Sequence, residues 1–513
     1  MGQVPQPTCE PVPSSTRTEA SERPTPPKSM DLMTLGGRTV ALSLALACNI
    51  TLAQSGDPAA DASPIQALAL TQDAPAEGGP WRLSEALGTP DWFEIKGTLR
   101  HRYEAFDEQF RASGGGENHA FVHRALVEMT VRSEYLSATA ELEDSRVYSG
   151  VSNAPMNTGI VNTLELLQGY VAGDFTDAFE EADELRVQLG RHTMDVGSRR
   201  LVARNRYRNT INAFNGLNTQ WRSRSGVEAR AFYTLPVQRL PRSASELYDG
   251  DVRFDEERSS VRFWGGHALF PQVAAGMDAE LYLFGIDESD ADGLNTRDRD
   301  LITFGTRWQK PRAAGDFFWE LESVFQTGES RSSSGSNQDL DHDAFFHHAS
   351  LGYAFEDENS SRIEALFDYA SGDDDPNDGE NNRFDTLFGA RRFEFGPTGI
   401  FGAFARANLV SPGLRFVTKP AKDWELMLTH RFHYLASDRD AWTTSGLVDP
   451  AGNAGDELGT LSEFRVRHDI APKSLRLEFG MAYLSAGSFI EDAPNATTQG
   501  DTLYGYVQTN FTF

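Results

Sequence analysis

Residues 93–105 read FEIKGTLRHRYEA, and apolar and polar side chains alternate along the whole stretch. A period of two is typical of a β-strand, because successive side chains of a strand point to opposite faces. One face carries Phe93, Ile95, Gly97, Leu99, His101, Tyr103 and Ala105, and the other carries Glu94, Lys96, Thr98, Arg100, Arg102 and Glu104. The stretch therefore predicts a long strand with one apolar and one charged face.

The same two-faced pattern recurs in segments that are far apart in the sequence. It is clear at residues 121–132, 136–143, 227–233 and 474–483. Such strands run about ten to thirteen residues, which is longer than usual in globular proteins and fits a tilted membrane crossing. A soluble sandwich also alternates, so the pattern alone leaves open which face is outside.

The lengths of the connections favour a membrane barrel. Short connections are expected at residues 133–134, 223–225, 309–315, 356–361, 419–423 and 471–473. Long polar ones lie between them, at residues 147–161, 237–257, 287–299, 328–342, 372–382, 437–459 and 487–500. Transmembrane β-barrels have this asymmetry. We predict an all-β fold: a transmembrane antiparallel barrel with short periplasmic turns and long extracellular loops.

The last strand and the strand count support the same architecture. Residues 503–513 alternate and end on the aromatic Phe513, which resembles the segment read by the outer-membrane barrel assembly machinery. The pattern gives about 18 to 20 strands, enough to enclose an aqueous channel. The open question is residues 383–410, which form either two strands or one long loop.

The N-terminal 53 residues are expected to be an extension and a signal peptide. Basic Arg38, an apolar run over residues 40–47 and a cleavage segment Thr51-Leu52-Ala53 form the pattern of an export signal. The upstream residues 1–29 suggest that translation starts at Met30 or Met33, and the alternative is a genuine disordered extension. Residues 54–91 are expected to be a flexible periplasmic linker, and residues 92–513 the barrel.

Composition excludes other classes of protein. Hydrophobic residues make up 39% of the chain, and it holds no apolar run long enough for a spanning helix. Both cysteines, Cys9 and Cys48, precede the expected cleavage site, so no disulfide or cysteine nucleophile is expected in the mature chain. Cys48 also permits a lipoprotein processing site as a minority reading. A net charge of -28 disfavours nucleic acid as a partner.

One segment is rich in arginine although the chain as a whole is acidic. Residues 185–216 begin as a strand and continue into a loop, and they contain Arg191, Arg199, Arg200, Arg204, Arg206 and Arg208. Arginines in a pore attract anions, because low-dielectric walls focus their field. The alternative is that lumenal arginines and carboxylates neutralise one another and stiffen the wall.

Strand parity gives a sharper expectation for this segment. Arg186 falls on the charged face, whereas Arg191 has the parity of the apolar Leu189. A charge facing lipid is costly, so we expect a bulge or the end of regular pairing near Gly190, which would turn Arg191 inward. The loop beyond it is expected to fold into the lumen as a constriction that carries Arg199, Arg200 and Arg204.

Several short motifs, in order along residues 92–513, resemble the alginate export family of outer-membrane barrels. They are GTLRHRYE at 97–104, ELEDSR at 141–146, residues 164–170, LGRH at 189–192, RRLV at 199–202, NAFNG at 212–216, FDTLF at 384–388 and the strand from Asn408. The resemblance implies an 18-stranded barrel, an extracellular loop at 383–407 and an arginine-rich constriction that selects a polyuronate.

Residue by residue, the resemblance places six arginines in the anion path, with Glu143 and Asp144 as their orienting partners. The six are Arg100, Arg102, Arg124, Arg191, Arg200 and Arg204. Arg186 and Arg199 are added to the anion path because of their places in the strand and the loop, and not because of the resemblance. The prediction is a passive outer-membrane channel of a Gram-negative bacterium, in contact with lipid, for acidic polysaccharides or other carboxylate solutes.

Two other functions stay open at this point. The first is a general or small-carboxylate porin, in which the arginines only screen charge. The second is an enzyme built on a barrel wall, for which the nearest cluster is His342 and His347-His348 beside Asp341 and Asp343. Exposed histidines next to acids in a polar loop are usually just solvated. We therefore expect no catalytic residues, no metal and no cofactor.

Overall fold

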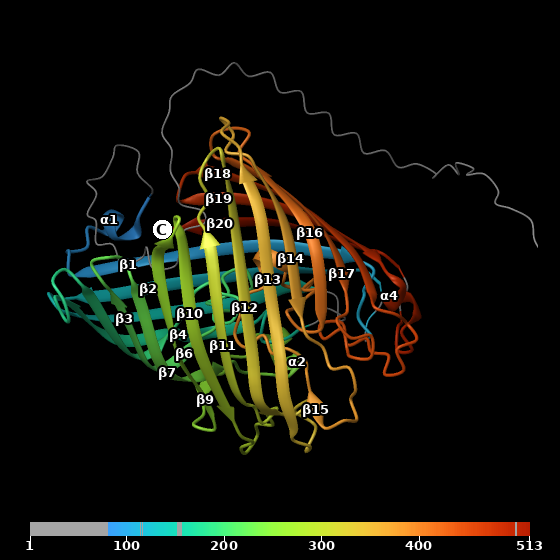
Figure 1. Ribbon diagram of the computed structural model, residues 1–513. Helices are drawn as coiled ribbons and strands as arrows, with labels where there is room; N and C mark the ends of the chain where they lie inside the picture. The colour runs from blue at the N-terminus through green and yellow to red at the C-terminus, as the bar shows by residue number, and fades with distance from the viewer. Residues whose placement is uncertain (1–80, 113, 115, 151–155, 498–499) are drawn as a thin grey trace, which may run out of the picture. The chain divides into compact units, whose positions relative to one another are not determined.

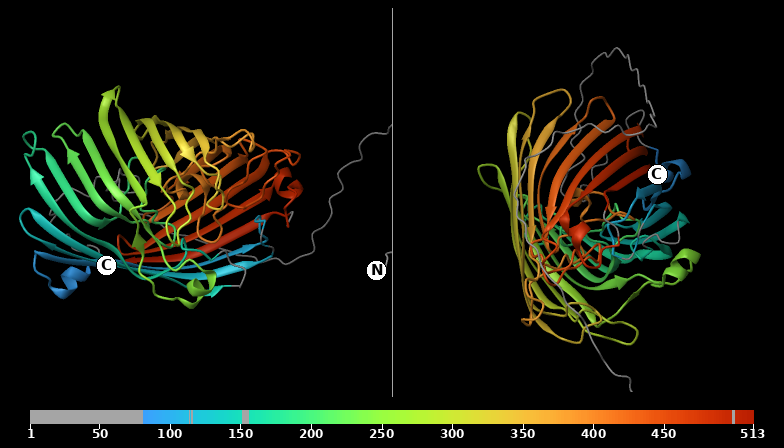
Figure 2. Two further views of the ribbon diagram at one scale, coloured as in Figure 1. Left: turned by 90° about the horizontal axis from the view of Figure 1, so that it is seen from below. Right: turned by 90° about the vertical axis from the view of Figure 1, so that its right-hand side faces the viewer.

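The computed structural model describes residues 81–112, 114, 116–150, 156–497 and 500–513. Within them, 18 long strands form one closed antiparallel ring, in which each strand pairs with its neighbours along the chain and the last strand pairs with the first. Figure 1 shows the ring with β1 and β20 adjacent, and the two views of Figure 2 show the wall curving round the interior. The predicted transmembrane barrel is confirmed, with 18 strands.

The strands of the ring are long, and most exceed ten residues. The first nine are β1 (Phe93–Asp107), β2 (Asn118–Arg132), β3 (Leu136–Gly150), β4 (Asn162–Thr176), β5 (Glu184–His192), β6 (Phe214–Arg222), β7 (Glu228–Gln238), β9 (Val261–Ala274) and β10 (Met277–Glu288). The second nine are β11 (Asp300–Lys310), β12 (Asp316–Ser330), β13 (Leu340–Ala354), β14 (Arg362–Ala370), β16 (Leu409–Thr418), β17 (Trp424–Tyr434), β18 (Glu457–Ala471), β19 (Leu475–Ala486) and β20 (Thr502–Thr512).

The remaining elements are short and lie in the connections. They are α1 (Leu83–Leu87), α2 (Ala244–Asp249), β8 (Glu256–Glu257), β15 (Glu380–Asn381), α3 (Arg392–Phe395) and α4 (Ser488–Asp492). None of the helices in the described residues is long and apolar enough to cross a membrane. The expected signal peptide, and the expected linker as far as residue 80, lie outside the described residues.

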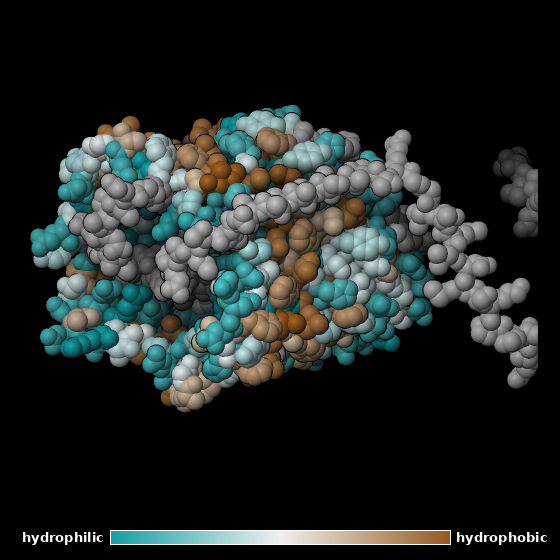
Figure 3. Space-filling view, turned by 90° about the horizontal axis from the view of Figure 1, so that it is seen from above, coloured by the Kyte–Doolittle hydropathy of each residue, from teal (hydrophilic) through white to brown (hydrophobic). Residues whose placement is uncertain are grey.

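The apolar face of the wall points outward. Leu189 and Leu281 are 59% and 52% exposed, whereas Arg102 and Glu143, on the charged face of their strands, are fully buried. Figure 3 shows hydrophobic side chains gathered on the outer face between hydrophilic regions. The charged face of each strand therefore lines the interior, as the alternation predicted for a barrel in lipid.

The connections alternate between short turns at one end of the barrel and long loops at the other. The sequence patterns missed the tight turn at Ala275–Gly276, between β9 and β10. Residues 371–408 form a single long connection, because β14 pairs directly with β16. The segment that the sequence left undecided is therefore one long loop, and the barrel has 18 strands.

Two of the long connections turn back into the interior: residues 193–213, here the first inner loop, and residues 382–408, here the second inner loop. The first inner loop reaches both Glu141 of β3 and Glu322 of β12, which stand eight places apart in the ring. The second reaches Glu463 of β18 and Gln326 of β12. Both loops therefore run across the lumen.

The buried apolar core lies between these loops and the wall, toward the end with the long connections. It includes Phe263 and Phe346 from the wall together with Val202 and Phe401 from the two loops. The loops also pair with each other, since Phe388 donates to the carbonyl of Leu201 at 2.9 Å. The two loops and this core therefore occupy much of the extracellular half of the lumen.

Candidate functional site

Arg100 and Arg124 are buried on the lumenal face of β1 and β2, and both bind the backbone of the first inner loop. Arg100 donates to the carbonyls of Arg206, Tyr207 and Arg208 at 2.9–3.0 Å. Arg124 donates to the carbonyls of Arg206 and Arg208 at 3.0 Å. Their acceptors are neutral carbonyls, so these two predicted anion-path residues anchor the loop in this structure.

Arg102 completes this anchor through the ring of Tyr207. Its guanidinium stacks 4.0 Å from the centroid of the Tyr207 ring, and Arg392 of the second inner loop stacks on the same ring at 4.6 Å. Arg102 also donates to Oε1 of Gln508 on β20 at 2.7–2.9 Å. One tyrosine thus lies between cations from the wall and from the other loop, a favourable arrangement where water is excluded.

Arg200 joins the two inner loops to the opposite wall. It forms ion pairs with Glu320 and Glu322 of β12, and its Nε donates to Oε1 of Glu394 at 2.7 Å. Glu394 is shared with Arg406 of the second inner loop. Burial alone would lower the pKa of Arg200, but Glu320 and Glu322 outweigh it and raise that pKa. The carboxylates around Arg200 balance its positive charge, and its role in this arrangement is structural.

Arg204 and Arg186 are each paired with one carboxylate of the wall. Nη2 of Arg204 lies 2.6 Å from Oε1 of Glu141 on β3. Nη1 of Arg186, nearer the end with the short turns, lies 2.6 Å from Oδ1 of Asp174 on β4. Both arginine side chains are at least four-fifths buried. Each positive charge is largely compensated by its carboxylate partner.

The expected interruption of pairing near Gly190 is wrong in part. The ladder between β5 and its neighbours continues in register through Arg191 to His192. Gly190 nevertheless has a φ of 125°, a conformation that side chains other than hydrogen rarely adopt. Arg191 binds Glu165 at 2.6 Å and Glu257 at 2.8 Å, so its charge is satisfied within the protein.

Glu143 and Asp144 form no direct ion pair with the arginines that the family resemblance assigned to them, although Glu143 interacts electrostatically with Arg124. Glu143 is buried in the lumen and accepts a hydrogen bond from Ser145 at 2.8 Å. Asp144 has the opposite parity and pairs with Arg146 at 2.8 Å on the outer side of β3. Among the described residues, neither carboxylate forms an ion pair with the six arginines of the expected anion path.

Two guanidiniums of the first inner loop stay exposed. Arg199 is exposed, packs 5.2 Å from the centroid of the Phe393 ring and forms no ion pair within the part of the chain that is described. Arg206 is 70% exposed and has one partner, Asp195, at 3.3 Å. Arg206 belongs to the arginine cluster of the sequence but was not among the predicted path residues. Arg199 and Arg206 differ from the other arginines of the cluster because their side chains are exposed. The spacing of arginines in the sequence does not reveal which of them are exposed.

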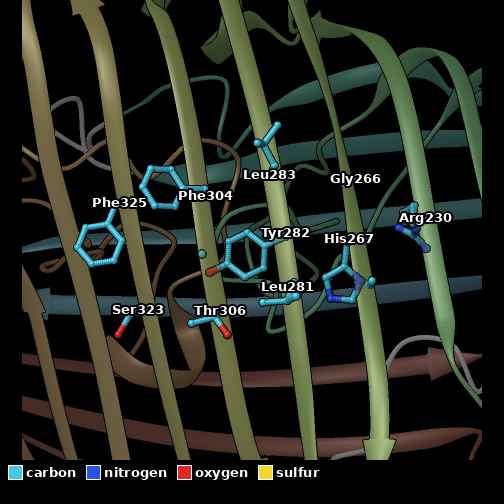
Figure 4. A pocket seen from close by; sticks show the side chains of 12 residues that line it. Arg230, Gly266, His267, Leu281, Tyr282, Leu283, Phe304, Thr306, Ser323 and Phe325 are labelled. Atoms are coloured by element: carbon cyan, nitrogen blue, oxygen red, sulfur yellow. The ribbon is translucent and has the colours of Figure 1, made fainter.

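A hollow in the wall lies on the outer face rather than in the lumen. It spans β7 to β12, where the small residues Gly266, Ala268 and Thr306 leave a gap beside the bulky pair Phe304 and Phe325. Figure 4 shows lining residues on adjacent strands, with Phe304 and Phe325 at one edge and Gly266 on the other side of Leu283. These five residues have outward parity, so the hollow opens mainly on the lipid-facing side, and Arg230, His267 and Tyr282 of the lumenal face also line it.

The histidines that the sequence offered as an enzyme-like cluster are separated by the wall. His342 contacts Ser330 and His348 binds Asp368, both inside the barrel, whereas His347 lies on the outer face. Within the described ranges, no group of three or more histidine, cysteine or acidic residues is arranged to hold one metal ion.

The comparisons with known proteins agree with this architecture. Residues 91–502 match the family described as alginate export. The chain belongs to the alginate export family. A search of curated proteins finds no match. Family membership and the barrel together make this protein a channel of the Gram-negative outer membrane.

Solved outer-membrane proteins share the fold of this alginate export family member at low sequence identity. Acinetobacter baumannii OccAB1 has a TM-score of 0.53 and 11% identity, covering 82% of this chain and 97% of that one. Acinetobacter baumannii OccAB3 has a TM-score of 0.51 and 11% identity, covering 82% of this chain and 99% of that one. Pseudomonas aeruginosa OpdK with vanillate has a TM-score of 0.51 and 11% identity, covering 82% of this chain and 98% of that one. At this identity the likeness shows the fold.

Proposed function

We propose that this channel passes anionic solutes by passive diffusion and that its substrate is an acidic saccharide of the uronate type. Membership of the alginate export family supports a carboxylate-bearing sugar polymer. The observation that carries the proposal is the pair of exposed guanidiniums, Arg199 and Arg206, on a loop inside the lumen. Arginine binds carboxylates through two parallel hydrogen bonds, which gives both attraction and orientation.

The buried arginines serve this function indirectly. Arg100, Arg102 and Arg124 hold the first inner loop through its carbonyls, and Arg200 ties it to the second loop. A loop fixed from both walls presents Arg199 at a constant position. Preorganised charge in a low-dielectric surrounding acts more strongly than mobile charge in water. We therefore assign selectivity to the two exposed residues and rigidity to the others.

The second candidate is a porin for small carboxylates. The observation in its favour is that two loops and an apolar core occupy much of the extracellular half of the lumen, which reduces the space for a polymer. Pseudomonas aeruginosa OpdK, whose fold is similar, was solved with vanillate, a small aromatic carboxylate. On either candidate the barrel conducts solutes.

Single-channel currents separate the two candidates. An oligouronate should block the current at lower concentration than a neutral oligosaccharide of equal length, and more strongly than a monomeric carboxylate. Arg199→Gln and Arg206→Gln should each weaken the block. Arg224→Gln, on the exposed pair with Glu181 in a short turn, is the matched control and should leave it unchanged. Equal block by charged and neutral sugars would exclude the saccharide proposal.

We also propose that the barrel assembly machinery engages the last strand through its aromatic end. Phe513 lies at the seam where β20 meets β1: its amide donates to the carbonyl of Gly97 at 3.0 Å, and its ring packs near Trp81. A terminal strand that closes the ring is the natural segment for a folding machine to hold until closure.

A further inference from the structure

Two histidines face each other on the outer wall of the first hairpin. His101 of β1 and His123 of β2 are directly opposite in the antiparallel register, and both have outward parity. Their Nδ1 atoms lie 3.3 Å apart, and their ring centroids 4.7 Å apart. Neither ring takes part in the lumenal network described above, so the solute path does not account for this pair.

The separation of the two nitrogens fits a shared metal ion as well as it fits a hydrogen bond. Two nitrogens that each lie about 2.0–2.1 Å from one tetrahedral zinc stand about 3.3–3.4 Å apart. Hydrogen bonds from N–H groups are most often about 2.9–3.0 Å long. The distance between His101 and His123 agrees with the first geometry, and it is a long distance for the second.

The surroundings hold both rings in place while leaving them accessible. Phe121 stacks on His101 at 5.9 Å, and Tyr148 packs 6.2 Å from His123. Tyr103 and Phe121 form the next outward pair along the hairpin. Aromatic side chains of this kind are enriched at the membrane interface of a barrel, and we infer that the histidines lie at a depth that water and dissolved ions reach.

We propose that His101 and His123 form a two-ligand site for a divalent transition metal such as Zn²⁺, Ni²⁺ or Cu²⁺. Neutral imidazole is a preferred ligand of these ions. No third histidine, cysteine or carboxylate of the described residues completes the set, so water fills the other positions and the ion exchanges. The bound metal clamps β1 to β2 directly beside the seam, since His101 also pairs with Thr509 of β20.

Thermal unfolding of the full chain in detergent, with and without Ni²⁺, Zn²⁺ or Cu²⁺, tests this site. A ligand that binds only the folded barrel raises its Tm. The wild type should show a metal-dependent rise, and His101→Ala and His123→Ala should each lose it. His119→Ala is the matched control, because His119 has the same outward parity on β2 but lies opposite Ala105, and it should keep the rise.

Copper spectroscopy adds a readout that does not depend on stability. Electron paramagnetic resonance of the Cu²⁺-loaded wild type should show coupling to two imidazole nitrogens, and to one in each single variant. Absence of any metal response in the wild type would mean that the pair is only hydrogen-bonded and would overturn the proposal. An unchanged response in both alanine variants would overturn it as well.

Discussion

Arg200 and Glu394 connect the two loops that cross the lumen, with Nε of the arginine 2.7 Å from Oε1 of the glutamate. Both side chains are buried, and both have further charged partners: Glu320 and Glu322 for the arginine, and Arg406 for the glutamate. The interior of this barrel is thus organised by a network in which three acidic groups surround one cation.

Replacing Arg200 should destabilise the barrel strongly. Arg200→Met leaves three carboxylates, two of them buried, without their shared cation, and removing one partner of a buried ion pair costs about 3–5 kcal/mol. Denaturant unfolding in lipid vesicles measures the loss. Arg224→Met, at an exposed turn, should change the free energy of unfolding by less than about 0.5 kcal/mol. Equal stability of the two variants would show that the network contributes nothing.

The ring of Tyr207 should matter more than its hydroxyl. Tyr207→Leu removes the surface on which Arg102 and Arg392 stack and should cost about 2 kcal/mol. Tyr207→Phe should be nearly neutral, because the buried Oη has no hydrogen-bond partner in the described residues. Hydrogen exchange of residues 193–213 should rise in the leucine variant alone. Faster exchange in the phenylalanine variant would contradict the stacking account.

A carboxyl pair between two extracellular loops should make stability depend on pH. Burial and the neighbouring Asp440 raise the pKa of Asp373 from 3.8 to about 6, even though Arg383 lies beside both. A raised folded-state pKa adds stability below the unfolded value, and this stability is lost as pH rises from 3.8 through about 6. Asp373→Asn should therefore remove part of the decline in Tm over that window.

The control for this effect is Asp374→Asn. Asp374 is the next residue along the chain and is exposed, whereas Asp373 is buried and its amide donates to Oδ2 of Asp440 at 3.1 Å. The control should keep the full pH dependence of the wild type. A parallel decline in all three proteins would mean that the carboxyl pair is not its source.

The closing seam should tolerate no side chain at Gly97. A Cβ there would lie 2.3 Å from the carbonyl oxygen of Leu126 and 2.7 Å from the ring of Phe513. Gly97→Val should thus lower the fraction of heat-modifiable, folded barrel on gels, since overpacking costs about 1–3 kcal/mol. Gly505→Ala, on β20 of the same seam, has 3.9 Å of room and should fold normally.

The sequence predicted the wall of this protein better than its interior. Alternation in segments such as 93–105 determines which side chains face lipid, and this local rule holds along whole strands. The partners of Arg200 could not be foreseen, because Glu322 and Glu394 lie 122 and 194 residues away and meet it across the lumen. No periodicity encodes a contact between a loop and the opposite wall.

The two errors near the site have different causes. Parity from Glu143 already places Asp144 on the outer face, so the resemblance to the family was given too much weight there. Near Gly190 the parity argument was sound, but a glycine with a φ of 125° and carboxylates at Glu165 and Glu257 accommodated Arg191 without ending the ladder. A long arginine reaches partners that a shorter side chain would miss.

The reversal potential of the purified channel in a planar bilayer, under a potassium chloride gradient, tests the central claim most directly. The account predicts a preference for chloride over potassium in the wild type, reduced in Arg199→Gln and reduced further when Arg206→Gln is added. A wild-type channel that prefers potassium, or a double variant with unchanged selectivity, would contradict it.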